Sequence, residues 1–124
     1  MVFVINKDKV LLLKRLNTWF GNNQFAVPGG LLDNTETPEA AACRETLEET
    51  GIEISPDNLR LLKKEICKAR GRIFENYYFY TSTWSGTLSN REPERHSDLN
   101  WYKITDLPKP LMPIVKSLIL QLPT

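Results

Sequence analysis

Short apolar runs separated by polar turns predict the strands in the first part of this chain. Residues 2–5 and 10–14 are β-branched or leucine-rich and flank a polar segment, which is typical of a β-hairpin with a short first strand. After a loop at 18–24, residues 25–27 form a brief extended segment that stops at a Pro-Gly-Gly turn. This part of the chain therefore predicts three short strands.

Longer strand patterns follow in the middle of the chain. Residues 59–69 and 73–83 predict two strands joined by the Arg-Gly-Arg turn at 70–72. A polar loop at 85–98 then leads to a short strand at 99–102. We expect most of the strands to be connected as hairpins.

Two segments carry helix signals. Thr37 is a suitable N-cap, Pro38 suits the first helical position and Gly51 supplies a C-terminal stop, so the sequence predicts a helix over 38–50. Residues 113–122 place apolar side chains at helical spacing behind a proline, which predicts a second, packing helix. Together the elements indicate a mixed α and β architecture.

Length and composition restrict the class of protein further. At 124 residues the chain has the size of one domain, and we expect residues 1–124 to form a single domain. Apolar residues make up 41% and charged residues 25% of the chain, as in ordinary globular proteins. The formal net charge of +1 favours neither nucleic acid nor membrane as a partner, and we expect neither.

The cysteines bear on the cellular compartment. Cys43 and Cys67 are too few for a disulfide framework and lack metal-site spacing, so we expect both to be small core residues in a reducing cytoplasm. The N-terminal apolar residues are interrupted by a polar turn and do not read as a signal or membrane segment. The expected location is therefore cytoplasmic.

Charge is distributed unevenly along the chain. Residues 33–49 carry six carboxylates against one arginine, whereas residues 60–72 carry six basic side chains against one glutamate. Solvated faces explain most charge runs, including the basic one. The cluster of Glu45, Glu48 and Glu49 requires more, because helical spacing brings these like charges to neighbouring positions. A divalent cation would relieve their repulsion, and Mg²⁺ prefers such oxygen ligands.

The acidic cluster is part of a longer pattern, GLLDNTETPEAAACRETLEETGI. This segment resembles the Nudix box, G-x5-E-x7-R-E-U-x-E-E-x-G-U, in which U is an apolar residue. Seven matches at set spacing arise by chance in about one in a million chains of this length. The flanking VLLLKR, FAVPGG and WYKITDLP extend the resemblance over most of the chain. The matching positions are Gly30, Glu36, Arg44, Glu45, Glu48, Glu49 and Gly51.

The chain departs from the family pattern at three places. Thr46 stands at a normally aliphatic position, which is expected to weaken packing slightly without touching catalysis. Thr35 stands where relatives commonly have glycine, so the loop is expected to turn differently. The first strand starts later than in relatives, which leaves the sheet edge and any substrate contact there open.

The resemblance assigns roles to the box residues. It implies that Glu48 and Glu49 bind Mg²⁺, for which Mn²⁺ is a possible substitute, and that Glu45 is either a further ligand or the general base. Arg44 lies four residues before Glu48 and is expected to hold one carboxylate in place. Backbone carbonyls near Gly30 would complete the metal shell. The expected catalytic residues are thus Glu45, Glu48 and Arg44.

Residues outside the acidic helix are assigned by the same resemblance. Glu36 is expected to be structural and bonded to loop backbone, and Glu92 is favoured over Glu94 as an additional metal ligand. Arg15 matches a phosphate-contacting arginine, with a surface strand-end charge as the alternative. His96, the single histidine, is expected to be a polar loop residue.

Aromatic residues supply the candidates for binding a nucleotide base. A base could stack on one or two of the rings, although aromatics in a small sheet protein are more often core residues. The candidates are Trp19, Phe20, Phe74 and Tyr78, of which Trp19, Phe74 and Tyr78 join Arg15 as expected substrate-binding residues.

The implied fold is the Nudix α/β/α sandwich, with a mixed β-sheet between helices. The implied activity is Mg²⁺-dependent hydrolysis of a nucleoside diphosphate linked to another group. The short chain is most similar to MutT-type enzymes, which convert a nucleoside triphosphate to the monophosphate and pyrophosphate. Two alternatives stay open: a hydrolase of ADP-ribose or a nucleotide sugar, and a nucleotide-binding module without activity. A homodimer also stays open, because relatives often dimerise.

Overall fold

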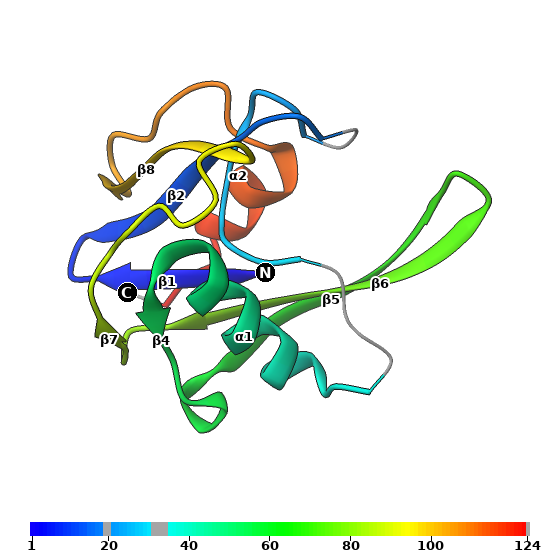
Figure 1. The fold of residues 1–124 in the computed structure, drawn as a ribbon, viewed down its shortest axis with the longest axis horizontal. Coiled ribbons are helices and arrows are strands. Elements are labelled where there is room, and N and C mark those ends of the chain that lie inside the picture. Colours follow the sequence, from blue (N-terminus) through cyan, green and yellow to red (C-terminus); the bar gives the residue numbers. More distant parts are fainter. Residues whose placement is uncertain (19–20, 31–34, 124) are drawn as a thin grey trace.

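The computed structural model describes residues 1–18, 21–30 and 35–123 and contains one mixed six-stranded sheet and one small two-stranded sheet (Figure 1). The six-stranded sheet has the order β3-β2-β1-β6-β5, with β8 paired to β2, and the small sheet consists of β4 and β7. The strands are β1 (Val2–Asn6), β2 (Lys9–Arg15), β3 (Phe25–Ala26), β4 (Ile52–Glu53), β5 (Arg60–Ala69), β6 (Arg72–Thr81), β7 (Ser85–Gly86) and β8 (His96–Lys103), and the helices are α1 (Pro38–Thr50), the short 3₁₀ helix η1 (Pro56–Asn58) and α2 (Pro113–Ile119).

Strand β1 lies inside the sheet. It forms the expected hairpin with β2 and pairs in parallel with β6, so that Val2 lies opposite Phe79 and Val4 opposite Thr81. Because β1 has a neighbour on both sides, the short first strand is not a sheet edge. The β5–β6 hairpin is also present as expected and extends well beyond the rest of the sheet (Figure 1).

The two faces of the sheet are covered by different helices. Phe3 points into a cluster that contains Val115 and Leu118 of α2, whereas its neighbours Val2 and Val4 point into a cluster with residues of α1. Successive side chains of a strand alternate between faces, so α1 and α2 must cover opposite sides. The expected α/β/α sandwich with a mixed sheet is therefore confirmed.

Helix α1 has the expected bounds and caps. The Thr37 hydroxyl accepts a hydrogen bond from the Ala40 amide at 3.1 Å, and Gly51 ends the helix in the left-handed region at φ 79°. A Cβ atom at Gly51 would lie 2.5 Å from the Thr87 carbonyl oxygen, so this position has no space for a side chain. The turn therefore holds the C-terminal end of the acidic helix against the chain that follows β7.

Several elements differ from the sequence prediction. Strand β8 begins at His96 instead of residue 99, and β7 lies within the segment expected to be a loop. The reason is pairing: β2 supplies hydrogen bonds to the polar start of β8, where Arg15 lies opposite His96, and β4 supplies them to β7. Helix α2 ends at Ile119 instead of residue 122.

Thr46 is buried without leaving a polar group unpaired. Its side chain has no exposed surface, and its hydroxyl donates to the Ala42 carbonyl one turn earlier at 2.8 Å. We expect Thr46→Val to change the free energy of unfolding by no more than about 1 kcal/mol in either direction, because the helical N–H bond to Ala42 remains and the shape is kept. Urea denaturation measures this, and a larger loss would show that the hydroxyl is needed.

Candidate functional site

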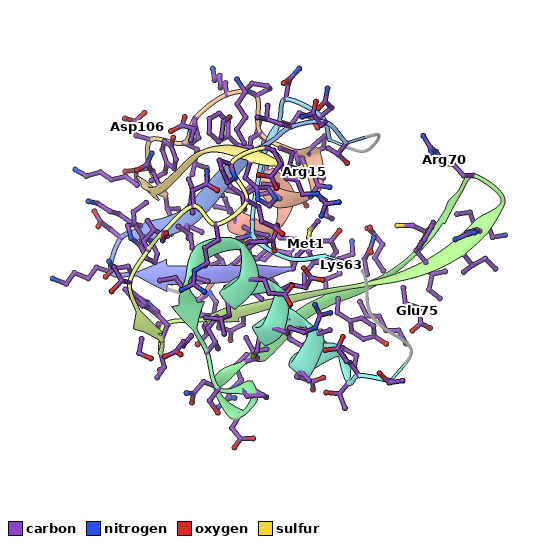
Figure 2. The ribbon with its side chains drawn as sticks, in the orientation of Figure 1. Met1, Arg15, Lys63, Arg70, Glu75 and Asp106 are labelled. Atoms are coloured by element: carbon purple, nitrogen blue, oxygen red, sulfur yellow. The ribbon has the colours of Figure 1, made fainter. Side chains whose placement is uncertain are left out.

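A cleft of about 730 Å³ is lined by residues of the acidic helix α1, the end of β2 and the β5–β6 hairpin. The turn at Gly29 and Gly30 also lines it, as do the segment before β8 and the first residue of that strand. Figure 2 shows Arg15 near the middle of the molecule and Arg70 at the far tip of the hairpin. The acidic, basic and histidine side chains that line the cleft are Arg15, Glu45, Glu49, Lys68, Glu75, Glu92, Arg95 and His96.

Glu49 is the most buried carboxylate of the acidic cluster. Only 5% of its side chain is exposed, and the Gly29 amide donates a hydrogen bond of 2.9 Å to its Oε2. Its other oxygen, Oε1, lies 3.1 Å from Nε2 of His96. Two contacts from separate segments therefore hold this carboxylate in one orientation.

Arg44 gathers three carboxylates around one guanidinium group. It binds Glu36 through two bonds of 2.7 Å, and its Nη1 lies 3.2 Å from oxygens of both Glu45 and Glu48. The expected contact between Arg44 and Glu48 is thus present, and Glu36 pairs with this arginine. The carboxylate of Glu48 is half exposed on the outer side of the helix, whereas Glu45 and Glu49 line the cleft.

Burial and neighbouring charge shift the pKa values of these groups. Burial is the main cause that raises the pKa of Glu45, the Glu49 carboxylate raises it further, and Arg44 offsets part of the rise. The bond to Glu36 raises the pKa of Arg44, so Arg44 stays charged. Burial lowers the pKa of Arg15, and Glu49 opposes that change. The cleft therefore holds carboxylates that gain from a nearby cation.

The donor atoms of this cleft suit a hard divalent cation. Glu45, Glu49 and Glu92 offer carboxylate oxygens from two segments, and oxygen ligands are those that Mg²⁺ and Ca²⁺ prefer. Gly30 lies directly against the Glu45 carboxyl group, because a Cβ at this position would be 2.8 Å from its Cδ. Because Gly30 has no side chain, the Glu45 carboxylate can lie beside its backbone. The backbone there can offer a carbonyl oxygen as a further ligand for the cation.

Gly30→Ala tests this close approach. The added methyl group would displace the Glu45 carboxylate, and we expect kcat/KM for the activity proposed below to fall by roughly ten- to a hundredfold. The melting temperature should change little, because Gly30 is exposed and does not adopt a positive φ. Steady-state kinetics and a melting curve measure the two effects; unchanged kinetics would mean that the Glu45 position is unimportant.

His96 is a functional candidate that the sequence did not reveal. Its ring is buried at the start of β8 and brings Glu49 and Glu92 together, so that one ligand atom of each of the three residues lies within 4.8 Å of the others. The expectation of a polar loop residue was wrong, because pairing with β2 extends the strand to His96 and turns the ring inward. The available signal was the i, i+4 spacing of Glu92 and His96.

The remaining predicted residues divide into three groups. Arg15, Phe74 and Glu92 line the cleft, whereas Glu94 is exposed outside it. Tyr78 is 1% exposed and packs in the core below α2, so its predicted stacking role is wrong: a covered ring offers no face to a base. Trp19 and Phe20 lie outside the residues that the structure describes.

The cysteines also differ from expectation. Both are free and half-buried, and Cys43 packs at the border of the cluster under α1. Cys67 instead lines the cleft, where its thiol donates to Glu65 at 3.1 Å, so the prediction of a core position is wrong for this residue. The described helices include none with the length and apolar character needed to cross a bilayer.

A family model described as the NUDIX domain matches residues 1–122. The crystal structure of a MutT NUDIX hydrolase from Burkholderia pseudomallei superposes with a TM-score of 0.86 at 29% identity and covers 98% of this chain and 94% of that one.

Curated relatives match over different lengths. An 8-oxo-dGTP diphosphatase of Escherichia coli is 29% identical over 113 residues, which are 90% of this chain and 86% of that protein. An ADP-ribose pyrophosphatase of Methanocaldococcus jannaschii is 50% identical, but over 50 residues that are 40% of this chain and 29% of the relative. The chain spans less than half the length of the first curated relatives.

Proposed function

This chain belongs to the NUDIX domain family, and on that basis we propose that it is a divalent-cation-dependent pyrophosphohydrolase that cleaves a nucleoside triphosphate to the monophosphate and pyrophosphate. The observation that carries the proposal is the convergence of Glu45, Glu49 and Glu92 in one cleft beside Arg44. Such a set of carboxylates is unfavourable alone and becomes favourable when a cation is bound.

The carboxylates have different roles in the proposed reaction. A bound divalent cation withdraws charge from phosphoryl oxygens and orients the attacking water. Glu49, which lines the cleft, and the half-exposed Glu48 would hold the cation, with Arg44 keeping Glu48 and Glu45 in position. Glu45 accepts a proton from the water at its carboxylate, a role that its raised pKa supports. Water then adds to phosphorus as the bridge between the α- and β-phosphoryl groups breaks.

The other cleft residues bind the substrate. Arg15 contributes a cation at the end of β2 and is proposed to contact the phosphate chain, where its partial burial strengthens the attraction. Phe74 projects from β6 into the cleft and is proposed to stack on the base. Outside the cleft, the basic tip of the hairpin is exposed, and we propose no substrate role for it.

We propose a nucleoside triphosphate as the substrate in place of ADP-ribose because of how much of the chain each relative matches. The likeness to the Escherichia coli 8-oxo-dGTP diphosphatase covers most of both chains, whereas that to the ADP-ribose pyrophosphatase is confined to less than half of this chain. The base pocket must lie outside the shared box, so the longer match is the more informative about substrate.

A substrate panel tests the proposal. The protein is incubated with Mg²⁺ or Mn²⁺ and with normal and 8-oxidised nucleoside triphosphates, ADP-ribose, nucleotide sugars and dinucleoside polyphosphates, and products are identified by ³¹P NMR. We expect monophosphate and pyrophosphate from a triphosphate, and no product in EDTA. Faster cleavage of ADP-ribose would overturn the substrate assignment, and no cleavage of any compound would overturn the activity.

Cation binding should also stabilise the fold. The raised pKa of Glu45 means that its ionised form opposes folding at neutral pH, and this opposition disappears as the pH falls through the folded-state pKa. Saturating Mn²⁺ should therefore raise the melting temperature by roughly 5–10 °C at pH 7.5, and by less at pH 5. Scanning fluorimetry measures this against KCl of equal ionic strength. An equal rise in melting temperature at both pH values would show that the cation does not act on the charge of the Glu45 carboxylate.

A further inference from the structure

His96 has one ring nitrogen in a contact and the other without one. Nε2 lies 3.1 Å from the Glu49 carboxylate, a hydrogen-bonding distance. Nδ1 is fully covered, and among the described residues it is the buried side-chain nitrogen or oxygen that has no hydrogen-bond partner. An unpaired buried polar atom is unfavourable, so the arrangement calls for a ligand at Nδ1.

The group that faces Nδ1 cannot satisfy it directly. Oε1 of Glu92 lies 3.9 Å away, which is too long for a hydrogen bond. In a neutral ring, the tautomer that donates from Nε2 to Glu49 leaves a lone pair on Nδ1, so two acceptors face each other. A bridging water would need about 2.8 Å to each atom and would have to lie well to one side. A first-row divalent ion needs about 2.0–2.2 Å to each and therefore fits between them.

The contact to Glu49 is the one that a metal-binding histidine usually makes. Such a histidine commonly donates its second ring N–H to a carboxylate, which fixes the ring and raises its basicity. Here the carboxylate is Glu49, itself held by the Gly29 amide. Only 9% of the His96 side chain is exposed, and the backbone of this residue is held by a hydrogen bond of 2.6 Å from the Asn90 side chain to the His96 carbonyl oxygen.

We propose that Nδ1 of His96 and the carboxylate of Glu92 bind a divalent transition-metal ion, such as Mn²⁺ or Co²⁺, at a second position beside the oxygen-lined site of Glu45 and Glu49. An imidazole nitrogen favours these ions over Mg²⁺, which prefers oxygen. Two protein ligands leave positions for water or a substrate phosphate. Glu49 couples the two positions, because it faces one with its carboxylate and orients the histidine of the other. The role in turnover rests on the proposed function, whereas binding itself does not.

The single histidine allows a direct test. Mn²⁺ is added to the untagged protein at one, two and three equivalents, with and without pyrophosphate, and pulsed EPR detects nitrogen bound to the ion. His96 is the only histidine in the chain, so ¹⁵N labelling of histidine must change the frequency of this coupling. We expect the coupling in wild-type protein and its loss in His96→Gln and Glu92→Gln, with Mn²⁺ affinity at this position falling about 10–100-fold. Glu94→Gln is the matched control and should keep both the nitrogen coupling and the Mn²⁺ affinity.

The outcomes are separable from those of the proposed function. Bound Mn²⁺ without nitrogen coupling under every condition would overturn the second position and leave His96 as a residue that only orients Glu49. This measurement uses wild-type protein and does not depend on the variants folding. Nitrogen coupling in a protein that cleaves no compound of the substrate panel would support the metal position and overturn the hydrolase. Loss of coupling in Glu94→Gln would also contradict the assignment to Glu92.

Discussion

Glu49→Gln is expected to lower kcat/KM for nucleoside triphosphate cleavage by about a thousandfold, which corresponds to roughly 4 kcal/mol of lost transition-state stabilisation. Glu49 is the carboxylate that the fold orients most firmly, through the Gly29 amide and His96. The amide of glutamine has nearly the same shape and keeps one oxygen for Gly29, but it removes the charge that attracts the cation. Cation binding should therefore weaken while the fold is retained.

Glu39→Gln is the matched control for this substitution. It removes the same charge from the first turn of the same helix at an exposed position outside the cleft, so kcat/KM should stay within about twofold. Circular dichroism and melting curves establish that both variants are folded. If Glu49→Gln retains wild-type kinetics in a folded protein, the metal role of Glu49 is wrong.

Arg44→Met is expected to lower kcat/KM by about 10–100-fold and to raise the Mg²⁺ concentration needed for half-maximal activity. The guanidinium group contacts Glu36, Glu45 and Glu48 at once, so its loss leaves three carboxylates to repel one another. High Mg²⁺ should restore part of the activity, because the cation replaces some of the missing positive charge. A titration of activity against Mg²⁺ measures both effects.

Arg44→Lys separates charge from geometry. Lysine keeps the positive charge but lacks the planar fork that binds Glu36 through two parallel bonds and reaches two further carboxylates. We expect activity between those of wild type and Arg44→Met. Equal activity of the lysine and methionine variants at every Mg²⁺ concentration would show that the fork is essential and charge alone has no value; full activity of Arg44→Met would contradict the positioning role.

Local sequence signals predicted the elements that depend on local interactions. Thr37, Pro38 and Gly51 set the bounds of α1, because caps and the left-handed stop act within a few residues. The two hairpins were also predictable, since their strands are adjacent in the chain and their turns are polar. The same reasoning could not reach the parallel pairing of β1 with β6 or the inner position of β1, which join segments far apart in sequence.

Burial explains the errors among the predicted binding residues. Tyr78 and Phe74 are four residues apart on one strand and so share a face, and no local pattern tells that the core covers Tyr78 while Phe74 lines the cleft. Cys67 was expected in the core, yet it lies near the turn of the β5–β6 hairpin and lines the cleft. These positions depend on which neighbour covers each face, and that is a property of the packed molecule.

The sequence by itself determined that Glu45, Glu48 and Glu49 share one helical region with Arg44, because a helix fixes the spacing of its own side chains. Only the tertiary structure decided that Glu45 and Glu49 face the cleft while Glu48 is half exposed. It alone brought Glu92 and His96 to Glu49, since strand β8 extends only because β2 supplies its hydrogen bonds. Contacts within one helix follow from local geometry, whereas contacts between strands and helices exist only once the sheet has assembled.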